Sequence, residues 1–279
     1  MRIHHLNCGT DCPVGGALMD GRSHGLLAHL VCHCLLIETD NSGLVLVDTG
    51  YGLRDVRQPL PRLSLVFKTL LNIHLREQET AIRQVEALGF SAGDVRHIVL
   101  THLDFDHAGG LEDFPEAKVH LMASEATAAT KHRSGFVASR RYRPMQFDEV
   151  HSWRQYRGGG EPWFGFDSVR DLEGLPPDIL LVPLRGHTIG HAGVAVQDAD
   201  GWLLHAGDAY FHHKEVRRVH PRCPPGLVAY QNLMEMDRDA RLANQERLRA
   251  LSLEHRRDLR MICAHDVLEY QACAAGRAM

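Results

Sequence analysis

The chain of 279 residues is 44% hydrophobic and 24% charged, an ordinary globular composition in a chain long enough to bury a sizeable core. Lysine and arginine total 31 against 35 acidic residues, a net charge of −4, which argues against nucleic acid or an anionic membrane surface as the partner. Short basic pairs such as Arg140-Arg141 are interpreted as solvated surface. Histidine is the exception, because 20 histidines are many for this length and several stand beside Asp or Gly.

The seven cysteines are odd in number and irregular in spacing, which predicts free thiols and a reducing compartment rather than a disulfide framework. Cys32 and Cys34 lie in an alternating, strand-like run, at a spacing that fits neither a zinc knuckle nor a thioredoxin motif, so both are interpreted as structural. The N-terminal residues lack the apolar core of a secretory signal, and no apolar stretch of about 18 residues exists. A cytoplasmic protein that does not contact membranes is therefore expected.

The first half of the chain alternates strand and helix patterns. Residues 33–50, "HCLLIETDNSGLVLVDTG", predict two strands joined by a turn at 41–43. The apolar run 62–75 predicts a helix, which either covers a site, contacts a second subunit or is simply buried. Residues 77–90 carry apolar side chains along one helical stripe, and a strand follows at 95–102.

Four later strands are each expected to end in a polar residue, namely Ser124, His187, Asp208 and His265. Polar residues at the C-terminal ends of strands are how α/β proteins build their sites. Residues 133–177 are rich in Arg, Gly, Pro and aromatic residues and predict a long irregular insertion of the kind that forms lids or binding loops. Residues 232–255 predict one long amphipathic helix.

The stretch "THLDFDHAGG" (101–110) concentrates ligand-type side chains at a sharp turn after a strand. There His102, Asp104, Asp106 and His107 can converge on one small volume, where they would be costly to bury without partners. One or two divalent cations remove that cost by turning carboxylates and imidazoles into ligands. The two glycines that follow allow the backbone to pass close to another segment.

Together, "LVDTG" (46–50), "THLDFDHAGG", "GHTIGH" (186–191), "AGDA" (206–209) and "AHD" (264–266) occur in an order that resembles the metallo-β-lactamase superfamily of metal-dependent hydrolases. The resemblance covers roughly residues 30 to 266. It implies an α/β fold, the four-layer αβ/βα sandwich with the metals at one edge. We expect residues 1–279 to form a single such domain, with insertions near 54–76 and 133–177.

The resemblance also implies two divalent metal ions, expected to be Zn²⁺. The ligands of the first ion would be His102, Asp104 and His187, those of the second Asp106, His107 and His265, and Asp208 would bridge the two. The family pattern has histidine at position 104, so Asp104 adds negative charge and oxygen character, which makes Mn²⁺ or Fe²⁺ alternatives. A weak first site and a one-ion enzyme is the other alternative. His191 is expected to be structural, and Asp48 to orient a ligand histidine by hydrogen bonding.

Within the superfamily the chain looks most like the N-acyl-homoserine lactonases. This implies a metal-bridging hydroxide that opens a lactone ring, with Asp106 orienting the nucleophile and passing on a proton. Tyr210 would face the oxyanion, although lactonases usually carry this tyrosine one residue further on. Residues 62–75 and 161–166 are candidates for an acyl groove, and 62–75 also suggests a homodimer. The alternatives are a glyoxalase II-like thioesterase, which shares "GHTIGH", and a non-catalytic metal-binding protein.

Overall fold

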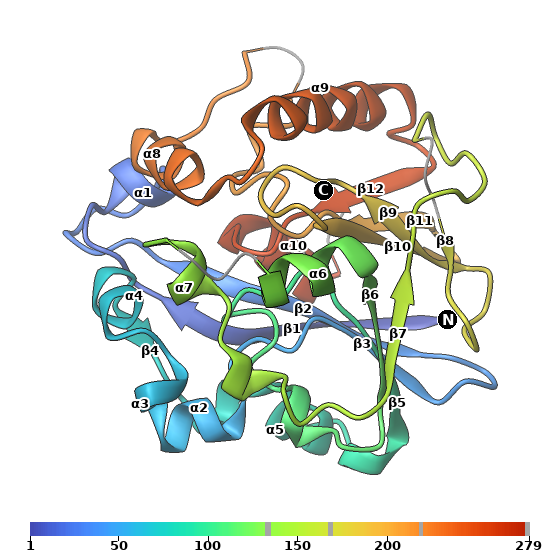
Figure 1. The fold of residues 1–279 in the computed structure, drawn as a ribbon. Coiled ribbons are helices and arrows are strands. Elements are labelled where there is room, and N and C mark those ends of the chain that lie inside the picture. The colour runs from blue at the N-terminus through green and yellow to red at the C-terminus, as the bar shows by residue number, and fades with distance from the viewer. Residues whose placement is uncertain (132–134, 167–169, 218–219, 277–279) are drawn as a thin grey trace.

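The computed structural model describes residues 1–131, 135–166, 170–217 and 220–276, and Figure 1 shows its strands and helices in chain order. The strands are β1 (Arg2–Asp11), β2 (Leu30–Glu38), β3 (Leu44–Val47), β4 (Ile73–His74), β5 (Val95–Val99), β6 (Lys118–Met122), β7 (Trp153–Tyr156), β8 (Arg170–Asp171), β9 (Ile179–Pro183), β10 (Ala192–Asp198), β11 (Gly201–His205) and β12 (Leu259–Ile262). The α-helices are α1 (Ala17–Asp20), α2 (Leu53–Arg57), α3 (Pro59–Arg62), α4 (Leu65–Leu70), α5 (Ala81–Ala87), α6 (Ala123–Lys131), α7 (Ala138–Arg141), α8 (Pro225–Met234), α9 (Arg238–Glu254) and α10 (Val267–Ala274).

The strands form two sheets, in the orders β4-β1-β2-β3-β5-β6-β7 and β12-β11-β10-β9-β8. Side chains from both sheets share one buried cluster, in which Ile37 and Val47 of the first meet Val194 of the second. Helix α5 packs on the outer face of the first sheet and α9 on the outer face of the second. The order helix, sheet, sheet, helix is the four-layer αβ/βα sandwich that the resemblance implies, and the fold expectation is confirmed.

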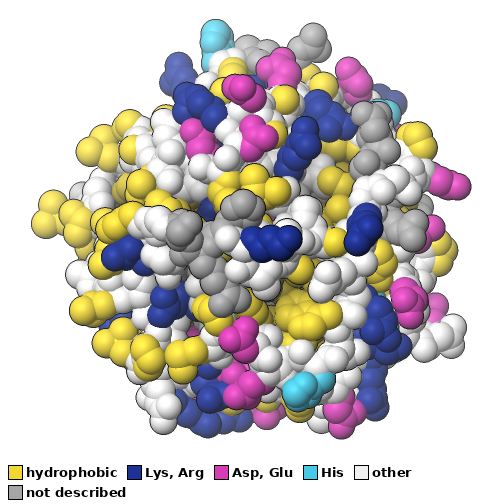
Figure 2. Space-filling model, in the orientation of Figure 1, with side chains coloured by type: hydrophobic (Ala, Val, Ile, Leu, Met, Phe, Trp, Pro, Cys, Tyr) yellow, Lys and Arg dark blue, Asp and Glu magenta, His cyan; other side chains and the backbone are white. Residues whose placement is uncertain are grey.

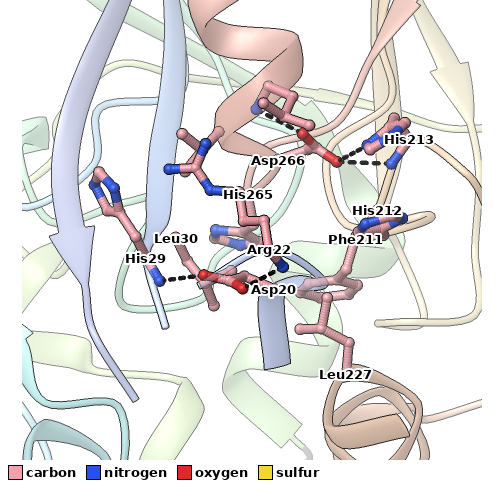
Figure 3. Close-up of a pocket in the computed structure, with 12 residues that line it drawn as sticks. Asp20, Arg22, His29, Leu30, Phe211, His212, His213, Leu227, His265 and Asp266 are labelled. Carbon is pink, nitrogen blue, oxygen red and sulfur yellow. Dashed lines mark hydrogen bonds and ion pairs between the residues drawn. The ribbon is translucent and has the colours of Figure 1, made fainter. Parts of the chain in front are cut away.

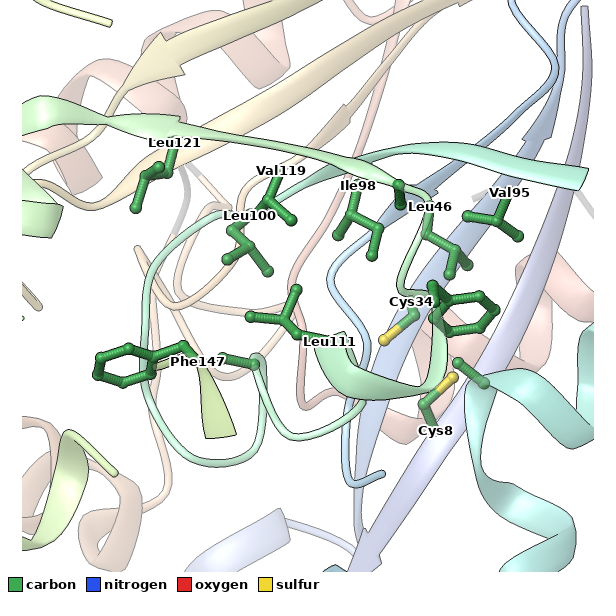
Figure 4. Packing of buried hydrophobic residues seen from close by; sticks show 14 of the residues in the cluster. Cys8, Cys34, Leu46, Val95, Ile98, Leu100, Leu111, Val119, Leu121 and Phe147 are labelled. Atoms are coloured by element: carbon green, nitrogen blue, oxygen red, sulfur yellow. The ribbon is translucent and has the colours of Figure 1, made fainter. Parts of the chain in front are cut away.

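The first sheet is apolar on both of its faces. Leu46 and Ile98 point outward into the cluster beneath α5 (Figure 4), whereas Val45 and Val47 point inward to the second sheet. Strands buried on both faces carry continuous apolar runs, and this explains why "LVLV" and "HIVL" show little alternation. Both strands end in the interior of the molecule, so the residues that follow them begin in a desolvated place.

Two expected elements differ from the structure. The segment 133–177 is not purely irregular, because β7 joins the edge of the first sheet and β8 the edge of the second. The helix expected over 232–255 is divided into α8 and α9. At the break, the backbone N–H groups of Met236 and Asp237 both donate to the carbonyl of Gly186, each at 2.9 Å. The Asp237 side chain then caps α9 by accepting from Ala240 N at 3.0 Å, which is a favourable helix start.

The apolar run 62–75 forms α4 and the short strand β4 rather than one helix. Leu63, Phe67 and Leu71 are buried, whereas Leu65 and Leu70 are exposed on the opposite side. None of the described residues belongs to a helix long and apolar enough to cross a membrane.

The glycine pair after the ligand-rich turn lies against the segment that follows β3. A Cβ atom added to Gly109 would lie 2.2 Å from Asp55 Oδ2 and 2.7 Å from the carbonyl oxygen of Gly50. The Asp55 carboxylate cannot easily retreat, because it is buried and ion-paired with Arg62 at 2.8 Å. The close backbone approach expected at these glycines is therefore an approach to residues 50–55.

Gly109→Ala should lower the free energy of unfolding by about 1–3 kcal/mol, since the added methyl group overpacks this contact. Urea denaturation of the metal-free protein measures the loss. Gly93→Ala is the matched control, because its Cβ would meet no atom nearer than Ser91 Oγ at 3.9 Å. Equal stabilities of the two variants would contradict this interpretation of the contact.

Candidate metal centre

Asp48 organises the turn that carries the ligand-type residues. It follows β3 with a backbone φ of 56°, a value that non-glycine residues rarely adopt. Its buried carboxylate accepts from Thr101 N, Thr101 Oγ1 and His107 Nδ1, each at 2.8 Å, and Thr101 Oγ1 accepts from His102 Nδ1 at 2.9 Å. Burial alone would raise the pKa of Asp48, but His107 holds it below its ordinary value. Both histidines thus present Nε2 to the interior, which is the orienting role expected for Asp48.

Four side chains from three segments form the first group of candidate ligands. The Nε2 atom of His102 lies 3.5 Å from Asp104 Oδ2 and 3.8 Å from Asp208 Oδ2. The Nε2 atom of His187 lies 3.0 Å from Asp104 Oδ2 and 3.4 Å from Asp208 Oδ2. The residues come from the turn after β5, the loop after β9 and the loop after β11.

The second group shares Asp208 with the first. Its Oδ1 atom lies 3.3 Å from His107 Nε2 and 3.1 Å from His265 Nε2, and Asp106 Oδ2 lies 4.0 and 3.7 Å from the same two nitrogens. His265 donates from Nδ1 to the carbonyl of Val31 at 2.8 Å, so its Nε2 is also free. The seven expected ligands therefore converge, with one oxygen of Asp208 on each side.

These donors fit divalent cations. Buried polar atoms are almost always hydrogen-bonded, yet five atoms of the candidate ligands have no partner among the described residues, namely His102 Nε2, Asp104 Oδ1, His107 Nε2, His187 Nδ1 and Asp208 Oδ1. Tetrahedral coordination at 2.0–2.1 Å would separate neighbouring ligand atoms by roughly 3.3–3.4 Å, and the separations above lie around that value.

The protonation of the centre depends on the shared carboxylate. Burial alone would lower the pKa of His265, but Asp208 raises it to about 9, and Asp208 likewise raises the pKa of the buried His107. Burial raises the pKa of Asp106. Without a cation, this interior therefore holds protons on His107 and His265 to balance the carboxylates.

His191 uses both ring nitrogens within the protein. Its Nδ1 donates to the carbonyl of Leu184 at 2.9 Å, and its Nε2 accepts from the backbone N–H of Asp208 at 2.9 Å. No nitrogen is left for a cation, and the ring holds the Asp208 backbone in place.

Tyr210 does not lie beside the candidate metal ligands. Its hydroxyl donates to Glu269 at 3.1 Å inside the core beneath α9, so it cannot face an oxyanion at the metal centre.

The next residue, Phe211, stacks on His265 with ring centroids 5.2 Å apart. Tyr230 of α8 packs edge-on against Phe211 at 5.7 Å. Burial and then Asp106 raise the pKa of Tyr230, so this tyrosine, which sequence reasoning missed, neighbours the centre.

Arg141 is a second residue that was missed, and its interpretation as solvated surface is wrong. Arg140 is half-buried and packs on Phe136 of its own segment, but the Arg141 side chain is completely buried and reaches Asp104 and His187. The sequence signal for a buried arginine was the extra carboxylate at position 104, because a buried carboxylate needs a positively charged side chain beside it.

Cys32 also lies closer to the centre than its structural interpretation suggests. Its thiol belongs to a group of potential ligand atoms with Asp106 and His265, all within 4.8 Å of one another. All seven cysteines are free thiols, as the spacing predicts.

A narrow pocket reaches the centre at His265 (Figure 3). On one side, His213 is held by a hydrogen bond of 2.7 Å between its Nδ1 and Asp266 Oδ2. On the other side, Asp20 accepts from the backbone N–H groups of Arg22 and His29 at 2.9 Å each. The lining mixes acidic and histidine side chains with five apolar residues, namely Leu30, Phe211, Leu227, Val267 and Leu268.

The residues proposed for an acyl groove divide into two groups. Trp163 and Phe166, from 161–166, are buried in the core beneath α9, so they do not form a groove. Exposed apolar side chains instead gather over α1, α4 and α8, at the left edge of the face in Figure 2; they include Leu18, Leu65, Val66, Leu70, Val228 and Leu233. Helices α1 and α8 also contribute Asp20 and Leu227 to the pocket.

Comparisons with known proteins agree with this geometry. Over 271 residues, the chain is 43% identical to a probable metallo-hydrolase of Mycobacterium tuberculosis, a match that covers 97% of this chain and 82% of that protein. It is 28% identical over 206 residues to an N-acyl homoserine lactonase of Bacillus cereus, covering 71% of this chain and 74% of the lactonase.

Solved structures show the same fold at low identity. An N-acyl homoserine lactone hydrolase with N-hexanoyl-L-homoserine at its catalytic metal centre superimposes with a TM-score of 0.70 at 20% identity, covering 97% of this chain and 95% of that chain. AidC, a dizinc quorum-quenching lactonase, gives 0.61 at 14% identity, covering 94% and 86%. Residues 28–244 match the metallo-beta-lactamase superfamily, and the chain is a metallo-hydrolase that belongs to this superfamily.

Proposed function

We propose that this hydrolase opens lactone or related ester bonds with the help of two divalent cations, Zn²⁺ in the first instance. The observation that carries the proposal is the convergence of the seven expected ligands, several with buried and unpartnered polar atoms, one of which, His265, also lines a pocket. His102, Asp104, His187 and Asp208 would hold the first ion, and Asp106, His107, His265 and Asp208 the second.

Bound divalent cations lower the pKa of coordinated water and polarise a substrate carbonyl. The protein's own residues supply the rest. Asp106, whose pKa burial raises, can hold the attacking water and then carry a proton to the leaving alkoxide. Tyr230, which packs against Phe211 beside His265, would take the oxyanion role that was expected of Tyr210. The shape of the pocket confines the reacting group beside His265.

The pocket supports a neutral substrate headgroup better than the thioester alternative. Glutathione thioesters carry two carboxylates and require cationic partners. Arg22 is the one arginine or lysine among the lining residues, and Asp20 lies beside it. The likeness to lactonases points the same way, and the exposed apolar side chains over α1, α4 and α8 offer a place for an acyl tail.

A substrate panel tests the proposal. Metal-loaded protein should hydrolyse N-acyl-homoserine lactones with a kcat/KM at least about tenfold above that for S-lactoylglutathione or bis-p-nitrophenyl phosphate, and chelation should abolish the activity. Rates are followed by pH indicator and by product chromatography, with Asp208→Asn as the inactive control. Strong thioester turnover without lactone turnover would favour the glyoxalase II-like alternative.

Metal binding should release protons. Because His265, with a pKa of about 9 in the metal-free protein, is protonated at pH 7 and must lose that proton to bind a cation, roughly one proton or more per chain should leave on Zn²⁺ loading. For the same reason, metal affinity should rise from pH 7 toward pH 9. Calorimetry in buffers of different ionisation enthalpy measures the release. A binding enthalpy independent of the buffer would contradict this charge assignment.

Two tyrosine variants separate the tyrosine near the centre from the one in the core. Tyr230→Phe should lower kcat by at least about tenfold with little change in KM, because it removes a hydroxyl next to the developing charge. Tyr210→Phe removes only the bond to Glu269, so it should affect stability and leave kcat unchanged. The reverse pattern would return the catalytic role to Tyr210. Metal content is measured for both variants so that loss of cations is not mistaken for loss of the hydroxyl.

A further inference from the structure

Arg141 is a completely buried arginine at the first group of ligands. Its Nη1 atom donates to the carbonyls of His187 (3.1 Å) and Met234 (2.9 Å). Its Nη2 atom lies 2.8 Å from Asp104 Oδ2 and 2.9 Å from His187 Nε2. The next residue, Tyr142, forms a β-bridge with Asp104, which fixes the backbone of this segment against the turn.

Burial of the Arg141 guanidinium destabilises the fold unless the charge is compensated at the centre. Burying a guanidinium costs several kcal/mol even after relaxation, and the Arg141 Nε atom has no partner among the described residues. Asp104 adds one negative charge where the family pattern has a neutral histidine, and Arg141 adds one positive charge beside it. The pair carries no net charge, so the charge of the centre equals that of the usual ligand set.

The pair also makes the two metal sites unequal. His187 Nε2 cannot accept a hydrogen bond from Arg141 and donate its lone pair to a cation at the same time. A cation in the first site must therefore replace that hydrogen bond, and it also meets the positive charge of Arg141. Among the described residues, the Arg141 side chain bonds only to His187, Met234 and Asp104. The second group, Asp106, His107 and His265, therefore carries neither of these two penalties.

We propose that Arg141 is a positioning residue of the first metal site, which acts with Asp104 as a neutral pair, keeps one carboxylate oxygen directed at the cation and makes the first ion bind more weakly than the second. This inference rests on the metal centre proposed above. It concerns the order and strength of metal binding, whereas the proposed function concerns the bond that is broken.

The experiment is a titration of metal-free protein with Co²⁺, followed by visible absorption, with metal per chain measured by elemental analysis. The wild type should fill in two separate steps. In Arg141→Met, the weaker step should tighten by roughly tenfold or more, because the competing donor and its charge are gone. The metal-free variant should also melt at a lower temperature, since Asp104 is left buried without its partner.

Two further variants make the test independent of folding losses. Asp104→His with Arg141 retained should keep about one ion per chain, because the unpaired guanidinium then opposes the first cation. The double variant Asp104→His/Arg141→Met should regain two ions, since the charge of the centre is restored. Arg140→Met is the matched control, because the guanidinium of Arg140 contacts Phe136 and Ser139 rather than the centre.

The inference is overturned if Arg141→Met titrates like Arg140→Met, or if Asp104→His alone binds two ions as tightly as the wild type. If the wild-type protein binds no Co²⁺ or Zn²⁺ at all, the proposal of a metal centre is itself refuted. Failure of the substrate panel with normal two-step metal binding would leave the role of Arg141 intact and refute only the lactone assignment.

Discussion

Mutual repulsion among three buried carboxylates is the constraint on which this structure depends. Asp104, Asp106 and Asp208 are almost completely buried, and Asp208 shares neighbouring histidines with each of the other two. Ionised groups in such a place are strongly destabilised unless they are compensated. Compensation comes from protons on His107 and His265, from Arg141 and from the cations that the donor geometry fits. The fold has to bring all of these to one point and hold them there.

The two sheets meet that requirement because the polar residues follow strands that end in the interior. β3, β5, β9, β11 and β12 each lead into a residue of the centre or into its support. The supporting bonds are short and local: Asp48 orients His107, Val31 orients His265, and His191 holds the backbone of Asp208. A metal site whose ligands are fixed in this way is organised before any cation binds.

Much of this could be predicted from the sequence, because the motifs carry a family resemblance that implies the ligand set, and apolar runs locate the strands that precede them. Side-chain direction could not. Tyr210 and Phe211 are neighbours that face opposite sides of the same loop, and a shift of one position separates the core from the centre. Arg141 was missed because α7 is too short to show which of its faces is buried, and burial of a charge depends on partners 37 and 46 residues away. The break between α8 and α9 is fixed by tertiary bonds to Gly186, and its local signal is Asp237, which caps α9.

That break has a consequence for how the molecule responds to its ligands. The carbonyls of Gly186 and His187 accept from the backbone N–H groups that follow α8. Arg141 donates to the carbonyls of both His187 and Met234. Helix α8, which contributes Leu227 to the pocket, is thus hydrogen-bonded to the segment of His187, a candidate metal ligand. Linkage between two sites is reciprocal. If a ligand in the pocket changes the affinity for the cation by some factor, the cation must change the affinity for that ligand by the same factor. The metal site and the pocket are in this way coupled through α8, which contacts both.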